Sequence, residues 1–138
     1  MTAQLFMLDT DTCIFLMRGE SQVLATKVQT VPLQQQVMSA VTFAELTYGV
    51  HASASAKRKQ NQAVLDSFAL HLAVLDWPQD AALHYAEIRA DLKKRGAQMG
   101  AADLMIAAHA RVLGAIVVTN IVKDFGRVKG LQVENWCK

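Results

Sequence analysis

Residues 101–120 read AADLMIAAHARVLGAIVVTN, and this stretch contains the structural unit from which the fold follows. Its first part is typical of a helix that begins near Ala101 or Ala102 and ends at Gly114, since glycine commonly follows the last turn of a helix. The next residues, AIVVT, form a short and continuously apolar run that is typical of a buried strand. A helix that leads directly into such a strand indicates an α/β protein.

The same alternation of strands and helices extends through the rest of the chain. Further strands are predicted at residues 5–9, 36–41, 74–77 and 131–136, and further helices at residues 12–19, 21–29, 42–50, 57–73 and 81–94. Short strands that are apolar along their whole length pack between two layers of helices. We therefore expect an α/β fold with a short parallel sheet of four to five strands and helices on both faces. A chain of 138 residues has room for one domain, residues 1–138.

Composition restricts the class of protein and its surroundings. The chain is 52% hydrophobic and 19% charged, as in a compact folded protein, and no apolar run reaches the roughly 18 residues that a membrane helix needs. Its first residues lack the basic segment and long apolar stretch of a secretory signal. Cys13 and Cys137 lie too far apart in sequence for a CxxC pair. We expect a cytoplasmic protein with reduced thiols and no membrane contact.

Four carboxylates border strongly apolar sequence, where a charged side chain is costly: Asp9, Glu45, Asp103 and Asp124. Burying an acid costs free energy unless a cation or hydrogen-bond donors meet it, so four such acids in separate segments suggest a shared cation. In open parallel sheets, functional residues gather at the carboxyl ends of the strands. Asp9 directly follows the first predicted strand, and Glu45 lies one turn beyond the second. Asp103 reaches that edge only if its helix begins there.

Oxygen ligands without His or Cys partners favour Mg²⁺ or Mn²⁺ over zinc. Divalent ions held by carboxylates can clamp a phosphodiester and activate an attacking water. Without a cation, mutual repulsion should raise the pKa of at least one acid. Glu45 also has a local interpretation, because Thr42 three residues earlier completes the pattern of a capping box at a helix start. The two roles of Glu45 are compatible.

The surface charge is more basic than the net charge of +2 indicates. The chain has 14 Lys and Arg and 12 Asp and Glu, so only eight acids remain once the four candidate ligands are set aside. The bases gather at residues 57–59, at residues 93–95 and in a C-terminal set of Lys123, Arg127 and Lys129. Each cluster alone is typical of a solvated helix face. Combined with a metal site, they indicate a nucleic-acid substrate.

Four segments taken together carry a family signature: MLDTDTCIFLMRG, FAELTYGV, GAADLMIAAHARVLGAIVVTN and DFGRVKGLQVENW. The chain resembles the PIN-domain ribonucleases, and among them the VapC toxins of bacterial toxin–antitoxin pairs, over nearly its whole length. This resemblance implies that the metal-binding acids of the family correspond to Asp9, Glu45, Asp103 and Asp124.

Other positions near these acids either match or depart from the same pattern. Thr119 and Asn120 match a polar pair that supports the site at the end of a strand. Asp11 stands where these proteins commonly carry Asn, and it adds a charge beside the site. Ile121 stands where a second Asn or an Asp is usual, so the ligand role of Asp124 needs the most direct test.

The resemblance implies an endoribonuclease that depends on Mg²⁺ or Mn²⁺ and arrests growth by cutting RNA, with tRNA as one substrate class. The expected reaction is in-line attack of an activated water on a phosphodiester, which leaves a 5′-phosphate and a 3′-hydroxyl. A cognate VapB-type antitoxin is expected to inhibit it, with a basic side chain in the acidic pocket and an amphipathic helix on the helices of residues 15–17 and 44–50. A homodimer is also expected.

Two other functions stay open at this point. Residues 9–12, Asp-Thr-Asp-Thr, resemble the loop of DxDx(T/V) phosphatases, although Cys13 breaks that pattern and the chain is short for a cap domain. A PIN-like module that binds RNA or a protein without cutting is favoured only by Ile121. His109 lies six positions beyond Asp103, about 240° around the helix, so we interpret it as structural.

Overall fold

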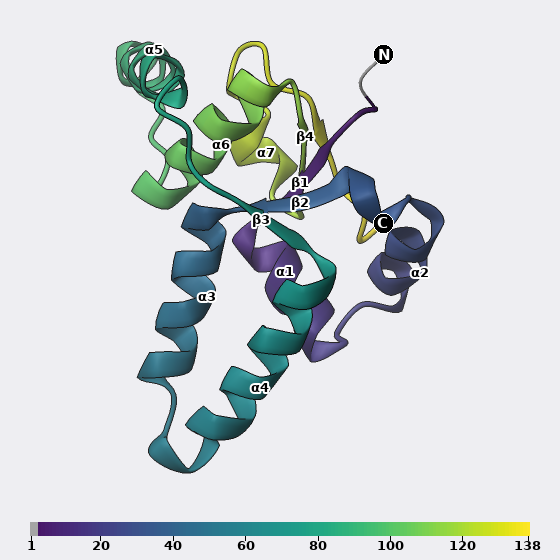
Figure 1. Ribbon diagram of the computed structural model, residues 1–138. Coiled ribbons are helices and arrows are strands. Elements are labelled where there is room, and N and C mark those ends of the chain that lie inside the picture. Colours follow the sequence, from purple (N-terminus) through teal and green to yellow (C-terminus); the bar gives the residue numbers. More distant parts are fainter. Residues whose placement is uncertain (1–2) are drawn as a thin grey trace.

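The computed structural model describes residues 3–138, which form a parallel sheet with helices on both faces (Figure 1). Five strands lie in the order β3-β2-β1-β4-β5, and their bounds are β1 Phe6–Leu8, β2 Gln36–Ser39, β3 Ala73–Leu75, β4 Ile116–Val118 and β5 Val133–Glu134. Met7 in the central strand pairs with Val37 on one side and Val117 on the other. All four strand pairs are parallel, so the carboxyl ends of the strands share one edge. The predicted fold class is confirmed.

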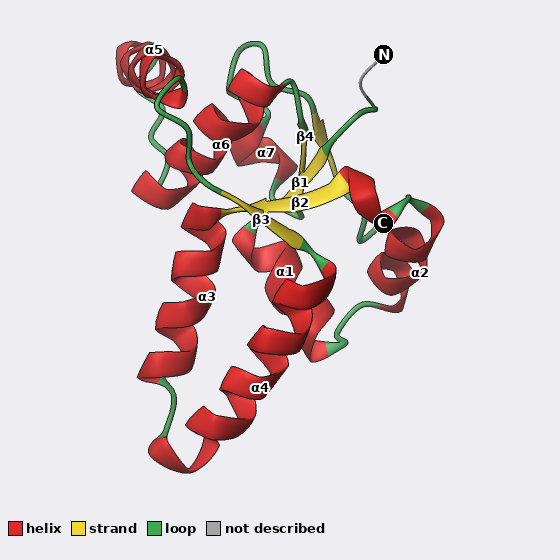
Figure 2. Cartoon of the chain, in the orientation of Figure 1, coloured by secondary structure: helices red, strands yellow, loops and turns green. Residues whose placement is uncertain are grey.

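The helices make up most of the chain (Figure 2). Their bounds are α1 Thr10–Arg18, α2 Gln22–Thr30, α3 Ala40–Ala52, α4 Ser55–His71, α5 Ala81–Lys94, α6 Ala101–Leu113 and α7 Val122–Phe125, with a 3₁₀ turn at Leu33–Gln35. Within residues 3–138, none of these helices has both the length and the apolar composition of a membrane span.

Alternate residues of the central strands pack into two separate cores. Met7 and Val117 pack with α5, α6 and Phe125 of α7, whereas Leu8 and Val118 pack with α1, α2, α3 and α4. Successive side chains of a strand point to opposite faces of the sheet. Since both faces of the central strands are buried, their sequences are apolar throughout and do not alternate with polar residues.

The predicted capping box at Thr42 and Glu45 is wrong. β2 ends at Ser39, and α3 begins at Ala40, so the predicted strand continued too far into residues 40 and 41. The Ser39 hydroxyl accepts a hydrogen bond from the Val41 amide at 3.1 Å and caps the helix. Thr42 is instead buried within the first turns of α3. Because Ser39 supplies the cap, the Glu45 carboxylate is not needed for it.

Other predicted boundaries differ from the structure by a few residues. α1 begins at Thr10, two residues earlier than predicted, because Asp9 caps it. Only Ser53 and Ala54 separate α3 from α4, so the predicted polar loop is shorter, and the predicted strand at residues 74–77 is instead Ala73–Leu75. The short α7 was not predicted. α5 has the predicted bounds, and Gly114 ends α6 in the left-handed conformation, with a φ of 67°.

Candidate active site

The four candidate acids lie on elements that meet at the carboxyl edge of the sheet. Asp9 directly follows β1, Glu45 lies in α3 after β2, Asp103 lies in the first turn of α6, and Asp124 lies in α7 after β4. The pKa of Asp103 is raised to about 6, first by burial and then by the negative charges of Asp9, Glu45, Asp11 and Asp124. Like charges disfavour the ionised form only when they are near. The side chains therefore share one electrostatic environment.

Asp9 is the most buried of these acids, and the residue is 1% exposed. Burial raises its pKa, while hydrogen bonds from Thr119 and Thr12 oppose that shift by stabilising the carboxylate. The backbone amide of Thr12 donates to Asp9 Oδ1 at 2.9 Å, and the Thr12 hydroxyl donates to the carbonyl of Val118 at 3.2 Å. These contacts hold Asp9 between the start of α1 and the end of β4.

Thr119 links Asp9 to the segment that contains Ile121. Its hydroxyl oxygen accepts a hydrogen bond from the backbone amide of Ile121 at 3.0 Å. Any residue except proline at position 121 can donate this amide bond. The apolar side chain of Ile121 packs instead against the core that contains α5 and α6.

Glu45 is exposed and is held by a residue that sequence reasoning did not select. The Thr10 hydroxyl lies 2.5 Å from Glu45 Oε1 and 3.3 Å from Thr42 Oγ1. One hydroxyl has a single proton, and a carboxylate accepts it more strongly than a second hydroxyl does, so Thr10 donates to Glu45. The only sequence signal for Thr10 is its position directly after Asp9.

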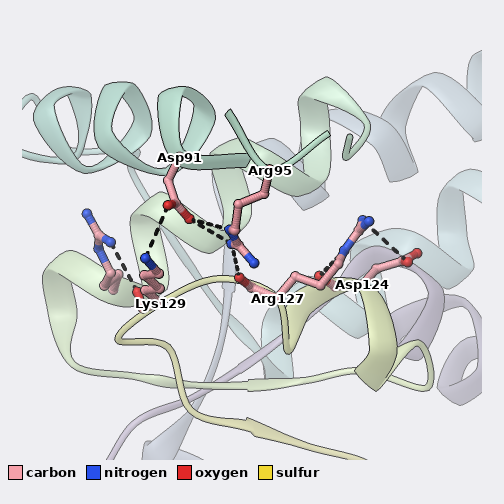
Figure 3. A network of polar contacts seen from close by, with 6 residues as sticks. Asp91, Arg95, Asp124, Arg127 and Lys129 are labelled. Atoms are coloured by element: carbon pink, nitrogen blue, oxygen red, sulfur yellow. Dashed lines mark hydrogen bonds and ion pairs between the residues drawn. The ribbon is translucent and has the colours of Figure 1, made fainter. Parts of the chain in front are cut away.

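Asp124 differs from the other acids because it faces a cation (Figure 3). Its Oδ1 lies 3.6 Å from Nη2 of Arg127, and its side chain is 47% exposed. Arg127 also donates to the carbonyl of Gln98 at 2.8 Å, and the carbonyl of Arg127 accepts a hydrogen bond from Arg95 at 2.5 Å. Asp124 contributes the smallest of the four charges that act on Asp103, smaller than that of Asp11.

The donor groups at this edge fit a hard cation such as Mg²⁺ or Mn²⁺. They are carboxylates and hydroxyls, joined by Asn120, whose Oδ1 is buried without a hydrogen-bond partner among the described residues. Such oxygen groups are the ligands that these ions prefer. His109 is not among them, because its Nδ1 is 2.8 Å from Ser39 Oγ and burial lowers its pKa, which confirms its structural role.

The acids interact electrostatically, but they do not form a preformed metal site. Across residues 3–138, no three Asp, Glu, His or Cys side chains converge on one point at ligand distances. Nevertheless, the negative charges of four other acids raise the pKa of Asp103. Carboxylates that repel one another separate until a cation compensates them, so ligand distances are not expected before the ion binds.

A groove lies beside the acids, between α1, α3 and α4. It has a volume of about 290 Å³ and is lined by Glu45 and Arg18 and by apolar residues that include Met17, Leu46 and Val64. The helices expected to offer an apolar surface, at residues 15–17 and 44–50, form two of its walls. Glu45 therefore belongs both to the acid cluster and to this groove.

Comparison with known proteins gives consistent similarities in sequence. The model of the PIN domain matches residues 6–130. The tRNA(fMet)-specific endonuclease VapC of Shigella flexneri is 42% identical over 133 residues, which span 95% of this chain and 97% of that protein. The enzyme of the same name from Salmonella typhimurium is 39% identical over 132 residues, or 96% and 98% of the two chains.

Solved structures agree with the sequence similarity. The crystal structure of DNA-bound VapBC from Salmonella typhimurium contains a chain with a TM-score of 0.90 and 37% identity, covering 98% of this chain and all of that one. VapBC2 from Rickettsia felis, bound to a DNA fragment from its promoter, has a TM-score of 0.89 and 32% identity, covering 96% and 99% of the two chains.

Proposed function

This chain belongs to the PIN-domain family, and on that premise we propose that it is a metal-dependent endoribonuclease, the toxin of a toxin–antitoxin pair. Relatives named as VapC endonucleases support the activity, and neighbours solved as VapBC complexes support the pairing with an antitoxin. The observation that carries the proposal is the convergence of negative charge on Asp103, with a pKa raised to about 6. Acids whose pKa values are raised by burial and by neighbouring like charges gather at functional sites.

We assign Asp9, Glu45 and Asp103 as ligands of Mg²⁺ or Mn²⁺, and Asp124 as a fourth acid. The ion, when bound, supplies positive charge that neutralises the phosphodiester and lowers the pKa of a water nucleophile. Hydrogen bonds from Thr12 and Thr119 stabilise the Asp9 carboxylate against the effect of burial, and Glu45 is oriented by Thr10.

The substrate in this proposal is RNA, with tRNA as the first class to test. Two relatives are named for tRNA(fMet), and the bases of this chain exceed its acids once the metal ligands are excluded. The cytoplasm is the compartment that fits this substrate and two unpaired cysteines, Cys13 and Cys137.

The inhibitor in this proposal is a VapB-type antitoxin that binds the groove between α1, α3 and α4. The apolar lining of this groove suits the apolar face of an amphipathic helix, and Glu45 at its wall suits a basic side chain that enters the acid cluster. We also expect a homodimer, which would cover exposed apolar residues such as Tyr48 and Leu83, 73% and 67% exposed. Light scattering of the purified toxin measures that state.

The proposal is tested by incubating the purified protein, freed of any partner, with total tRNA and Mg²⁺. The wild type should cut, and Asp9→Asn should not, because the amide lacks the charge that a divalent ion requires. Chelation with EDTA should stop cutting, and added Mn²⁺ should restore it. Equal cutting by both proteins would refute the metal-nuclease assignment. Binding of tRNA by both proteins without any cutting would instead favour a non-catalytic binding module.

A further inference from the structure

A second groove lies on the other side of the first turn of α6, away from the proposed antitoxin groove. It has a volume of about 380 Å³ and lies between α5 and the loop that leads into α6. Ala101 and Leu104, two residues before and one residue after Asp103 in α6, contribute to its wall. Part of the groove wall therefore lies in the same helical turn as Asp103.

One face of α5 gives this groove its chemical character. Tyr85, Arg89 and Lys93 line it at intervals of four residues, a spacing that places three side chains on one face of a helix. Arg89 Nη1 donates to the Tyr85 hydroxyl at 2.9 Å, and its guanidinium carbon lies 5.9 Å from the centre of the tyrosine ring. Leu92 and Leu104 are buried below them. The groove thus combines two cations with an aromatic ring over an apolar floor.

The cations of this face are free, whereas the acids of α5 are paired elsewhere. Asp91 binds Arg95 at 2.6 Å and Lys129 at 3.3 Å. Glu87 likewise binds Arg111 of α6 at 2.7 Å. In the part of the chain that the structure describes, neither Arg89 nor Lys93 has a carboxylate within 4 Å. An anion that enters the groove meets two uncompensated positive charges.

We propose that this groove binds a nucleotide of single-stranded RNA next to the scissile phosphate, with its phosphate on Arg89 and Lys93 and its base against Tyr85. The inference rests on the proposed ribonuclease activity and extends it to how the substrate is held. An acid cluster repels the RNA backbone, so a neighbouring cationic surface is needed to bring the phosphodiester to it. An aromatic ring next to the cations accepts any base, since every base has a face that can stack.

The first test compares two double variants with the same change in charge. R89A/K93A removes the two cations of the groove, and R58A/K59A removes two exposed cations at the start of α4, the end of that helix distant from the sheet (Figure 1). With total tRNA and Mg²⁺, R89A/K93A should raise KM about tenfold and leave kcat within about twofold of the wild type, because the lost contacts bind the backbone and not the reacting atoms. R58A/K59A should change KM less than about twofold, because this cluster, which the sequence alone groups with the other bases, lies at the end of α4 that is distant from the sheet edge (Figure 1). Alanine is compatible with the exposed helical positions, and melting curves check folding.

The second test measures binding without cutting. Each double variant is combined with Asp9→Asn, and the affinity for a fluorescent oligouridylate of about twelve nucleotides is measured between about 50 and 200 mM salt. The slope of log Kd against log salt should fall by about 0.7 for each phosphate contact that R89A/K93A removes. It should stay unchanged for R58A/K59A. Equal slopes and affinities for the two pairs would overturn the groove assignment, whether or not the wild type cuts RNA.

A third comparison isolates the ring. Tyr85→Phe keeps an aromatic face, whereas Tyr85→Leu keeps a similar apolar bulk without it. The phenylalanine variant should bind oligouridylate like the wild type, and the leucine variant should lose about five- to tenfold in affinity, as expected for one lost stacking contact. Equal losses in both variants would exclude stacking on Tyr85. If the wild type cuts no RNA, the proposed function fails, while these binding measurements still decide the groove.

Discussion

The acid cluster at the sheet edge and the ion-pair network of Asp91, Arg95 and Lys129 both contain aspartate. In the network the aspartate faces cations, whereas in the cluster Asp103 is close to other acids. In the network, hydrogen bonds from Arg95 lower the pKa of Asp91, with Lys129 adding to the effect (Figure 3). In the cluster, burial and neighbouring acids raise the pKa of Asp103 to about 6. The two aspartates lie twelve residues apart in sequence. Compensation of the negative charge by nearby cations, and not the mere presence of acids, therefore distinguishes the ion-pair network from the candidate functional site.

Asp124 and Arg127 connect these two regions. Asp124 adds to the field on Asp103, yet it also faces Arg127, which bonds to the loop before α6. Within residues 3–138, Asp124 is therefore the one acid of the cluster that has a partial counter-charge. Substitutions in either region therefore test whether the two regions act independently.

The largest expected effect is the loss of activity in Asp103→Asn. Asp103 is the acid whose pKa the other charges raise. Replacing it should lower kcat by more than about 100-fold, because residues that only contact a metal ligand already contribute about 10- to 100-fold. Cleavage of total tRNA in Mg²⁺ measures it. Asp91→Asn is the matched control, since it makes the same substitution in the network and should cut at the wild-type rate. Comparable losses in both would contradict the separation of the two regions.

The second effect concerns stability, and its sign is opposite in the two regions. The folded pKa of Asp103 is above its ordinary value of 3.8, so the folded state holds this proton more tightly than the unfolded state. Its contribution to stability is present below about pH 4 and is lost as the pH rises through about 6. Removing the charge in Asp103→Asn should therefore increase the free energy of unfolding at pH 7.5 by about 1–2 kcal/mol, after allowing for solvent screening.

Urea unfolding in EDTA at pH 4 and pH 7.5 measures this stabilisation. At pH 4, the variant and the wild type should differ little, because Asp103 is protonated in the folded wild type. A variant that is no more stable than the wild type at pH 7.5 would show that the acids do not strain the metal-free fold.

A third and smaller effect is expected from Thr10→Val, which removes the hydroxyl that donates to Glu45 and keeps the shape of the side chain. Partners that orient a metal ligand contribute about 10- to 100-fold, and we expect the lower value because Glu45 is exposed. Thr47→Val is the control, since among the described residues its hydroxyl bonds only the carbonyl of Phe43 within α3, at 2.7 Å. Rates at increasing Mg²⁺ concentration separate weaker metal binding from a slower reaction. Equal rates for the two variants would remove Thr10 from the site.

The smallest expected effect is the change in stability of Asp91→Asn. Its carboxylate has a lowered pKa, so its contribution to stability is present at neutral pH and is lost as the pH falls below its ordinary pKa. The variant should be slightly less stable than the wild type at pH 7.5, the opposite of Asp103→Asn. Thermal melting at low and high salt measures it, since salt should reduce the difference. A stabilised variant would mean that the network is under strain as well.

Much of the fold could be predicted because its determinants are local. The bounds of α5 and the ends of α6 follow from apolar spacing and from Gly114, and the strands follow from short apolar runs. The wrong boundaries have a local origin as well. Residues 40–42 fit either a strand end or a helix start, and the capping hydrogen bond of Ser39 decides between them. Thr42 and Glu45 fit the sequence pattern of a capping box, but Ser39 caps the helix instead.

The sequence by itself determined that this is an α/β protein with acids at the ends of apolar segments, because the periods of strands and helices and the cost of burying a carboxylate are properties of short segments. Only the tertiary structure decided which acids act on one another, that Thr10 holds Glu45, and that Arg127 bonds to Gln98. Those facts depend on side chains that are distant in sequence and close in space. Coulomb interactions follow distance through space, and the chain brings these residues together only when the sheet is complete.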